Sequence, residues 1–223
     1  NDKNLKNKIT KDLNNKIQLI YIGKKKNEGV NNAVNDAFKK IESEFFYICA
    51  TDDIINFTFA LRSLKILSIY PTSPFVFSNI CINNELNNQK IKLDFSFLKK
   101  GYHDSLSVFK TFKNNQFKIY HNTVIFRSKF FLEDNIHNNK YGDRCDMLNL
   151  YYLSFKYGFV YLNEFLSEFT IRKGQIGTMK NDKYLYNELI YLKKNKLDFY
   201  KKYIAANLHY DFSILAVIKF IKY

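Results

Sequence analysis

The sequence contains little proline, glycine and cysteine, and no tryptophan. Two prolines and seven glycines among 223 residues exclude collagen-like, proline-rich and linker-dominated chains. The three cysteines, Cys49, Cys81 and Cys145, are far apart and odd in number, which predicts a reducing compartment rather than a disulfide framework. CxxC and HExxH motifs do not occur and the four histidines are isolated, so a structural zinc site is not expected.

Long hydrophobic runs are also lacking, because the longest, such as residues 214–218, fall far short of the ~20 residues of a membrane-spanning helix. The chain is nevertheless 46% hydrophobic and 25% charged, and it contains 22 Phe and 17 Tyr. This composition is typical of a globular protein rather than a disordered one. The length suits one ordinary domain with a short appendage.

Positive charge is in excess and unevenly distributed. The net charge is +14, of which residues 1–26 carry +6 and residues 193–223 carry +5. Thirty-one of the 35 basic residues are Lys, and 27 residues are Asn, a bias that an AT-rich genome produces without selection. The alternative is attraction to an anionic membrane face or to anionic substrates. A nucleic-acid-binding protein is less well supported, since only four Arg are present and no binding motif occurs.

Hydrophobic periodicity predicts alternating strands and helices in the first third of the chain. Strands are predicted over 17–22, 45–50 and 75–82, with helices over 30–41 and 56–70 between them. This order is typical of an α/β fold with a largely parallel sheet. The continuous apolar run at 45–50 suits a strand that is covered on both faces.

The remainder of the chain gives weaker signals. Extended segments are predicted over 91–98 and 117–126, and a helix is predicted between them over 103–112. A strong helix pattern over 143–157 ends at Gly158, and short strands are predicted over 159–162 and 165–171. From residue 179 onward the pattern is helical and basic.

Two adjacent carboxylates, Asp52 and Asp53, follow the predicted strand at 45–50. Ligands of parallel α/β sheets bind beyond the carboxyl ends of strands, so the position of this pair is informative. Adjacent carboxylates repel each other unless a positive charge compensates, and Mg²⁺ or Mn²⁺ does so while sharing oxygen ligands with substrate phosphates. The alternative is a solvated turn, or a cap for the helix that begins near Asn56.

The residues before this pair carry a resemblance to a known family. Residues 27–35 read N-x-G-x-x-x-A-x-N and are followed by an amphipathic helix, a strand and Asp-Asp. This order resembles the nucleotide-sugar-binding half of the family-2-type inverting bacterial glycosyltransferases, which have the GT-A fold. The resemblance implies a divalent metal, Mn or Mg, on Asp53 with Asp52 beside it. It also implies that the sugar nucleotide contacts Asn27, Gly29, Asn35, Asp52 and Asp53.

Two departures from the family pattern are visible in the same region. Many members have D-x-D-D where this chain reads Ala50-Thr51-Asp52-Asp53. The family often has Arg at the position of Val34.

A second stretch resembles the acceptor side of the same family. An acidic helix start at 143–146 is followed by G-x-x-Y-x-x-E from Gly158 to Glu164. In the family this acidic residue is the catalytic base, and spacing to Gly158 favours Asp146, with Asp143 second. The alternative is that these acids cap the helix and interact with its dipole. One residue can cap the helix while the other does chemistry.

The resemblance implies direct displacement with inversion. Asp146 would accept the proton of an acceptor hydroxyl as it attacks the anomeric carbon, and the metal would neutralise the leaving diphosphate. Arg172 and Lys173 begin a loop with two glycines, which either closes on the diphosphate or is a solvated connection.

The fold expected from the resemblance is a Rossmann-like, mixed and mainly parallel central sheet flanked by helices. A GT-A-like domain would cover 1–178 and a basic helical extension 179–223. Asn1-Asp2 is similar to the tail of a D-G-S-x-D segment, which predicts an N-terminally truncated copy that is weak or inactive alone.

The expected reaction moves a sugar from a nucleotide donor to a carbohydrate or lipid-linked acceptor in bacterial surface polysaccharide or lipopolysaccharide synthesis. The expected location is cytoplasmic. The last segment, 212–222, would either lie on the inner membrane face or dock on the core. The competing class is an interaction module with a catalytically degenerate version of the fold.

Overall fold

The computed structural model describes residues 20–50, 53–115, 118–134, 145–172 and 182–207, with only the backbone given for 182–188. The chain divides into two compact units, the first ending at Ile41 and the second comprising Glu42–Tyr223. The expected boundary at residue 178 lies outside the described residues. Among the residues that are described, no helix is long and apolar enough to cross a membrane.

The first unit contains helix α2, Val30–Phe38, which confirms the helix predicted over 30–41. Its N-cap is Gly29 with φ +85°, a conformation that glycine adopts without steric cost. The strand predicted over 17–22 is wrong in its described part, since residues 20–22 form no strand and are exposed. Branched residues favour a strand only where neighbouring strands pair with them and bury them.

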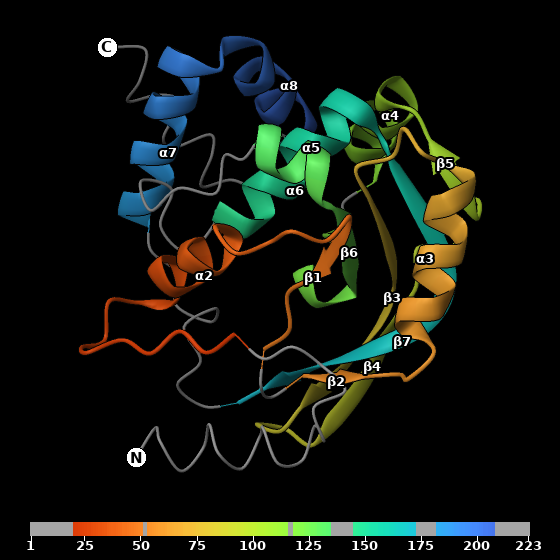
Figure 1. Cartoon of the computed structure of the whole chain (residues 1–223). Coiled ribbons are helices and arrows are strands. Elements are labelled where there is room, and N and C mark those ends of the chain that lie inside the picture. The colour runs from red at the N-terminus through yellow and green to blue at the C-terminus, as the bar shows by residue number, and fades with distance from the viewer. Residues whose placement is uncertain (1–19, 51–52, 116–117, 135–144, 173–181, 208–223) are drawn as a thin grey trace. The chain divides into compact units, whose positions relative to one another are not determined.

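The second unit is built on one mixed sheet (Figure 1). Seven strands of its described residues take part, in the order β1-β6-β3-β7-β2, with β4 added to β3 and β5 added to β7. The strands are β1 Phe45–Tyr47, β2 Ile54–Ile55, β3 Phe75–Asn84, β4 Gln89–Leu93, β5 Gly101–His103, β6 Val124–Arg127 and β7 Phe159–Ile171. The expected mixed, Rossmann-like α/β architecture is confirmed.

The expectation of a mainly parallel sheet is wrong for the described strands. Only β3 and β7 pair in parallel, and the other five pairs are antiparallel. Strands β1 and β3 do run in the same direction, but β6 lies between them and runs the opposite way. Strand β1 therefore lies at the end of the strand order and is half-buried, rather than covered on both faces.

The helices of the second unit are α3 Phe59–Ile69, α4 Ser105–Asn114, α5 Ser128–Glu133, α6 Cys145–Tyr157, α7 Asp182–Asn195 and α8 Leu197–Asn207, with a 3₁₀ turn η1 at His121–Thr123. These bounds confirm the helices predicted over 56–70 and 103–112, and the described part of the helix predicted over 143–157. Helix α3 buries Phe59 and Leu67 against Val76 and Val160 of the sheet. Burial of such side chains contributes roughly 1.5–3 kcal/mol each.

Aromatic side chains fill the centre of the sheet and join the C-terminal helices to it. The ring of Phe77 lies 4.9 Å from that of Phe159, edge to face. Helix α8 packs on α6 through aromatic pairs, such as Tyr152 with Phe199 at 5.2 Å between ring centroids. Edge-to-face pairs add about 0.5–1.5 kcal/mol beyond area burial. The abundant Phe and Tyr of the sequence thus serve the core.

Strand β7 replaces the two short strands predicted over 159–162 and 165–171. Its parallel register with β3 shifts on either side of Asn79, from Ser78 opposite Leu162 to Asn79 opposite Phe165. The polar pair at 163–164 is therefore a bulge within one strand rather than a turn between two. Such bulges bend a strand and redirect its side chains.

Candidate active site

The carboxyl edge of the parallel pair is formed by the ends of β3 and β7, at Asn84 and Ile171. Strand β2 pairs with β7 near this edge, with Ile54 opposite Glu168. Asp53 directly precedes β2, so it lies at the edge where ligands of open α/β sheets bind. The sequence predicts an acidic group at such an edge. In the structure, however, β1 ends at Tyr47 and a loop separates it from Asp53.

Asp53 lies near the end of β1 and the 3₁₀ turn. Burial raises the pKa of the Tyr47 phenol, and the nearby Cys49 thiol and Asp53 carboxylate raise it further. The Tyr47 hydroxyl donates a 2.8 Å hydrogen bond to the backbone carbonyl of Asn122. Tyr47 therefore connects the surroundings of Asp53 to η1.

Residues 120–123, η1 with its N-cap Tyr120, form a compact segment that we call the 120–123 turn. The Thr123 hydroxyl and the Thr123 backbone N–H both donate to the Tyr120 carbonyl, at 2.7 and 2.9 Å. The Tyr120 ring lies 5.9 Å from the Phe169 ring of β7, between centroids. Because β2 and Asp53 lie along the same part of β7, this side of the turn faces the sheet edge.

The other side of the turn meets the start of α6. Asp146 lies in the first turn of α6, and its Oδ1 accepts a 2.6 Å hydrogen bond from the backbone N–H of Met147. Burial lowers the pKa of His121, and the Asp146 carboxylate opposes this shift. His121 and Asp146 are thus close enough to interact electrostatically.

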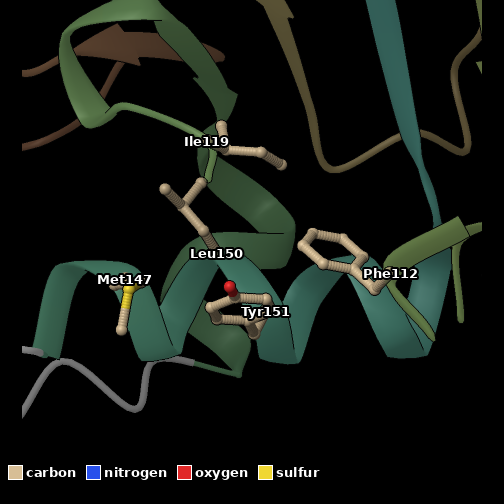
Figure 2. A pocket seen from close by; sticks show the side chains of 5 residues that line it. All are labelled: Phe112, Ile119, Met147, Leu150 and Tyr151. Atoms are coloured by element: carbon tan, nitrogen blue, oxygen red, sulfur yellow. The ribbon is translucent and has the colours of Figure 1, made fainter. Parts of the chain in front are cut away.

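An apolar hollow confirms that α6 packs beside this segment. Figure 2 shows its lining side chains, from α4, α6 and the residue before the turn: Phe112, Ile119, Met147, Leu150 and Tyr151. Its empty space amounts to about 160 Å³ when space open to solvent is included, and it leaves no room for a water molecule. The hollow is a packing feature and is too small for a sugar nucleotide.

Asp53 and Asp146 are therefore both linked to the same short turn, Asp53 through Tyr47 and Asp146 through His121. The expected partners Asp52 and Asp143 lie outside the described residues. Asp146 also stabilises its own helix, because a carboxylate in the first turn interacts favourably with the helix dipole. Its role as a base and that of Asp53 as a ligand stay predictions.

The N-x-G-x-x-x-A-x-N residues lie in the first unit and make local contacts. The Asn27 side-chain oxygen accepts a 2.9 Å hydrogen bond from the Gly29 N–H, which shapes the chain before α2. Asn35 lies on α2. Sequence reasoning missed an ion pair in this unit, between Lys24 and Asp36. The hydrogen bond from Lys24, and to a lesser extent the one from Lys39, lowers the pKa of Asp36 to about 2.

Arg172 follows the end of β7, and its Nε donates a 3.0 Å bond to the Glu85 carboxylate in the turn after β3. Both side chains are about half exposed, so a diphosphate at this position would compete with Glu85 for the guanidinium. Lys173 lies outside the described residues. The predicted role of Arg172 remains a prediction.

A divalent metal would have to be bound by side chains with ligand atoms, chiefly carboxylates, among the described residues. No group of three or more His, Cys, Asp or Glu gathers among them. Mg²⁺ commonly uses one or two protein carboxylates together with substrate phosphates. A carboxylate at the sheet edge fits that donor set, so Asp53, with Asp52 beside it in sequence, remains a suitable pair.

Sequence reasoning missed the 120–123 turn. His121 is one of the isolated histidines of the sequence, and Asn122 is one Asn among 27. The available signal is a polar triplet, His121-Asn122-Thr123, between apolar Ile119-Tyr120 and Val124. That signal marks a turn before a strand but does not indicate which carboxylates pack against it.

No protein-family model matches this sequence, and no curated protein matches it significantly. Its fold is similar to that of residues 1–349 of TarS, a glycosyltransferase from S. aureus. With the UDP complex the TM-score is 0.60 at 15% identity, covering 89% of this chain and 56% of that chain. With TarS 1–349 alone the TM-score is 0.62 at 13% identity, covering 93% of this chain and 60% of that chain. This chain therefore spans less than two thirds of either structure, and the likeness establishes the Rossmann-like fold alone.

Proposed function

We propose that this chain is a glycosyltransferase that moves a sugar from a nucleotide donor to a hydroxyl group of a carbohydrate or lipid-linked acceptor, with inversion. The observation that supports the proposal is that Asp53, beside β2 near the carboxyl edge of the sheet, and Asp146, at the start of α6, are both linked to the 120–123 turn. The similarity to TarS, whose structure contains UDP, supports a nucleoside diphosphate as the carrier.

Asp146 is the proposed general base. Its side chain is half-buried at a helix start, so it is accessible and lies in a field that favours negative charge. It accepts the proton of the acceptor hydroxyl while the hydroxyl oxygen forms a bond to the anomeric carbon and the bond to the diphosphate breaks. Attack from the face opposite the leaving group inverts that carbon. A positioned base contributes typically ~10²–10⁴-fold in rate.

Asp53, with Asp52, is the proposed holder of a divalent metal, Mn or Mg. When bound there, the metal would supply charge neutralisation for the departing nucleoside diphosphate. Asp53 is half-buried beside Tyr47, and a carboxylate is an oxygen ligand that Mg²⁺ and Mn²⁺ prefer.

The remaining assignments extend the proposal. Asn27, Gly29, Asn35, Arg172 and Lys173 would contact the sugar nucleotide. Synthesis of a bacterial surface polysaccharide or lipopolysaccharide, and contact of the basic C-terminal segment with a membrane face, belong to the same proposal.

The decisive experiment screens a panel of nucleotide sugars for hydrolysis and transfer in the presence of Mn²⁺. Asp53→Asn and Asp146→Asn should each reduce turnover at least ~100-fold, in line with the loss of charge stabilisation or of a general base. Asp198→Asn is the matched control, since Asp198 also lies in the first turn of a helix, α8, and should retain activity. Full activity in either test variant would reject the role of that residue.

A nucleotide-binding measurement separates an enzyme from a degenerate module. UDP binding that requires Mn²⁺, is weakened in Asp53→Asn and is unchanged in Asp146→Asn supports the division of roles. Binding without turnover of any donor would favour the module instead. A chain that binds no nucleotide under any condition would exclude both.

A further inference from the structure

Two buried nitrogen atoms of the 120–123 turn lack a hydrogen-bond partner. They are Nε2 of His121 and Nδ2 of Asn122, and neither meets an acceptor among the described residues. The large majority of buried polar side-chain atoms in proteins are hydrogen-bonded, so two exceptions on adjacent residues are unusual. Asn122 is only 7% exposed.

The two residues are linked to different carboxylates. Asn122 accepts the Tyr47 hydroxyl through its backbone carbonyl at 2.8 Å, which places it on the side of Asp53. His121 interacts with Asp146, which places it on the side of α6. The turn that carries the unbonded groups is therefore linked both to the proposed leaving-group site and to the proposed base, the two ends of the interval that a substrate would fill.

A direct displacement requires the transferred sugar to occupy that interval, because its anomeric carbon is attacked from one side while the diphosphate leaves on the other. We infer that the 120–123 turn binds the transferred sugar, with the side chains of His121 and Asn122 hydrogen-bonding its hydroxyl groups. This inference rests on the proposed function and adds two specificity-determining residues to it.

The chemistry of the turn favours a neutral sugar. The Asn122 amide donates to a hydroxyl oxygen, and an uncharged imidazole can both accept from a hydroxyl and donate to one, depending on its tautomer. Burial lowers the pKa of His121 and so favours the uncharged ring at neutral pH. The neighbouring Asp146 carboxylate repels a second carboxylate, so a hexose or N-acetylhexosamine fits better than a uronic acid.

The turn is accessible from the surface at its margins. Tyr47, Asp53, Tyr120, His121 and Asp146 are each half-buried rather than enclosed. A sugar that reaches them would supply the partners that the two nitrogen atoms lack. Both atoms are buried, so sugar binding requires the side chains of the turn to move.

The test compares the binding of UDP with that of UDP-glucose, UDP-N-acetylglucosamine and UDP-glucuronic acid by calorimetry with Mn²⁺. The variants are Asn122→Leu, which keeps the branching of the side chain, and His121→Phe, which keeps an aromatic ring. Neither changes the backbone carbonyl that accepts from Tyr47. Each should bind UDP as the wild type does, but should lose about fivefold of the extra affinity for the preferred neutral UDP-sugar, the worth of one hydrogen bond. Asn115→Leu is the control, because the Asn115 side chain donates to the Thr111 carbonyl of its own helix end, away from the 120–123 turn in sequence.

Melting temperature provides a readout that does not depend on nucleotide binding. If Asn122 serves a ligand, Asn122→Leu removes an unbonded buried polar group and should raise the melting temperature by about 2–4 °C. A lower melting temperature in both variants, or unchanged preference for UDP-sugars over UDP, would overturn the inference while leaving the proposed function standing. Tightest binding of UDP-glucuronic acid would also overturn it. A wild-type chain that binds neither UDP nor any UDP-sugar would overturn both.

Discussion

The Asn79 side chain should be among the most sensitive positions of the fold. It is 1% exposed, and its Oδ1 accepts from the Tyr161 hydroxyl at 2.7 Å and from the Phe95 N–H at 3.2 Å. Its Nδ2 donates to Asn163 Oδ1 at 2.9 Å. These bonds lie where the β3–β7 register shifts, so Asn79 supplies the contacts that the interrupted strand ladder cannot supply.

Asn79→Leu keeps the number and branching of the side-chain heavy atoms and removes all three bonds. Each bond contributes about 1 kcal/mol net, and a buried donor left without a partner adds about 1–3 kcal/mol. The expected loss in the free energy of unfolding is therefore about 4–6 kcal/mol, a large part of the ~5–15 kcal/mol of a typical domain. Tyr161→Phe removes the bonds of one hydroxyl, to Asn79 at 2.7 Å and to Asn163 at 3.2 Å, and should cost about 1–2 kcal/mol.

Urea denaturation of the wild type, both single variants and the double variant measures these values. The coupling between Asn79 and Tyr161 should be about 0.5–3 kcal/mol, as for residues in one buried network. A cost below ~1 kcal/mol for Asn79→Leu, or a coupling near zero, would refute the argument that this amide holds the bulge. Ser68→Ala, an exposed hydroxyl on α3 that bonds the Lys65 carbonyl, is the control and should be nearly neutral.

Two predictions concern titration. The folded-state pKa of His121 is lowered, mainly by burial, so the unfolded chain binds the proton more readily and stability should fall as pH drops below the unfolded value of about 6.5. Between pH 7.5 and pH 5.5, the melting temperature of His121→Phe should therefore fall less than that of the wild type. An equal fall in both proteins would contradict the assignment. The pKa of Asp36, about 2 beside Lys24 and Lys39, should move back toward its ordinary value of 3.8 in Lys24→Met; carboxyl-carbon NMR against pH measures it, with Lys90→Met as the control.

Helices were predictable because their signal is local. The period of apolar residues identifies α2, α3, α4 and α6 to within a few residues at each described end. The sheet was less predictable, because strand pairing joins distant segments. Nothing in residues 117–126 indicates that β6 lies between β1 and β3, and this insertion makes most of the sheet antiparallel.

The errors in the strands have specific physical causes. The polar pair Asn163-Glu164 interrupts an apolar run and predicts a turn, but Asn79 on the neighbouring strand accommodates it as a bulge. The β-branched run at 20–22 predicts a strand, but those residues have no strand structure and stay exposed. In both cases a contact partner, present or missing, decides the local structure.

In the candidate site, too, residues with a local sequence signal were predicted and residues that depend on distant contacts were missed. Asp53 and Asp146 were identified from motif order, which carries the resemblance, and neither His121 nor Asn122 belongs to a motif. The importance of the turn arises from contacts such as that between Tyr47 and Asn122, which are 75 positions apart. Single-sequence reasoning has no access to such contacts, and the structure supplies them.

The turn also offers a physical reason why two carboxylates so distant in sequence can act on one substrate. Tyr47 bonds the turn through a backbone carbonyl, a contact that side-chain substitution in the turn cannot remove. The Thr123 hydroxyl and N–H close the turn on the Tyr120 carbonyl, and Ile119 continues into the apolar contact with Met147 of α6. The spacing between the sheet edge and the start of α6 therefore depends on a short, internally bonded backbone segment rather than on flexible side chains. A site that must keep a leaving group and a base apart by the width of one sugar benefits from such a spacer, because reactive geometry tolerates little displacement.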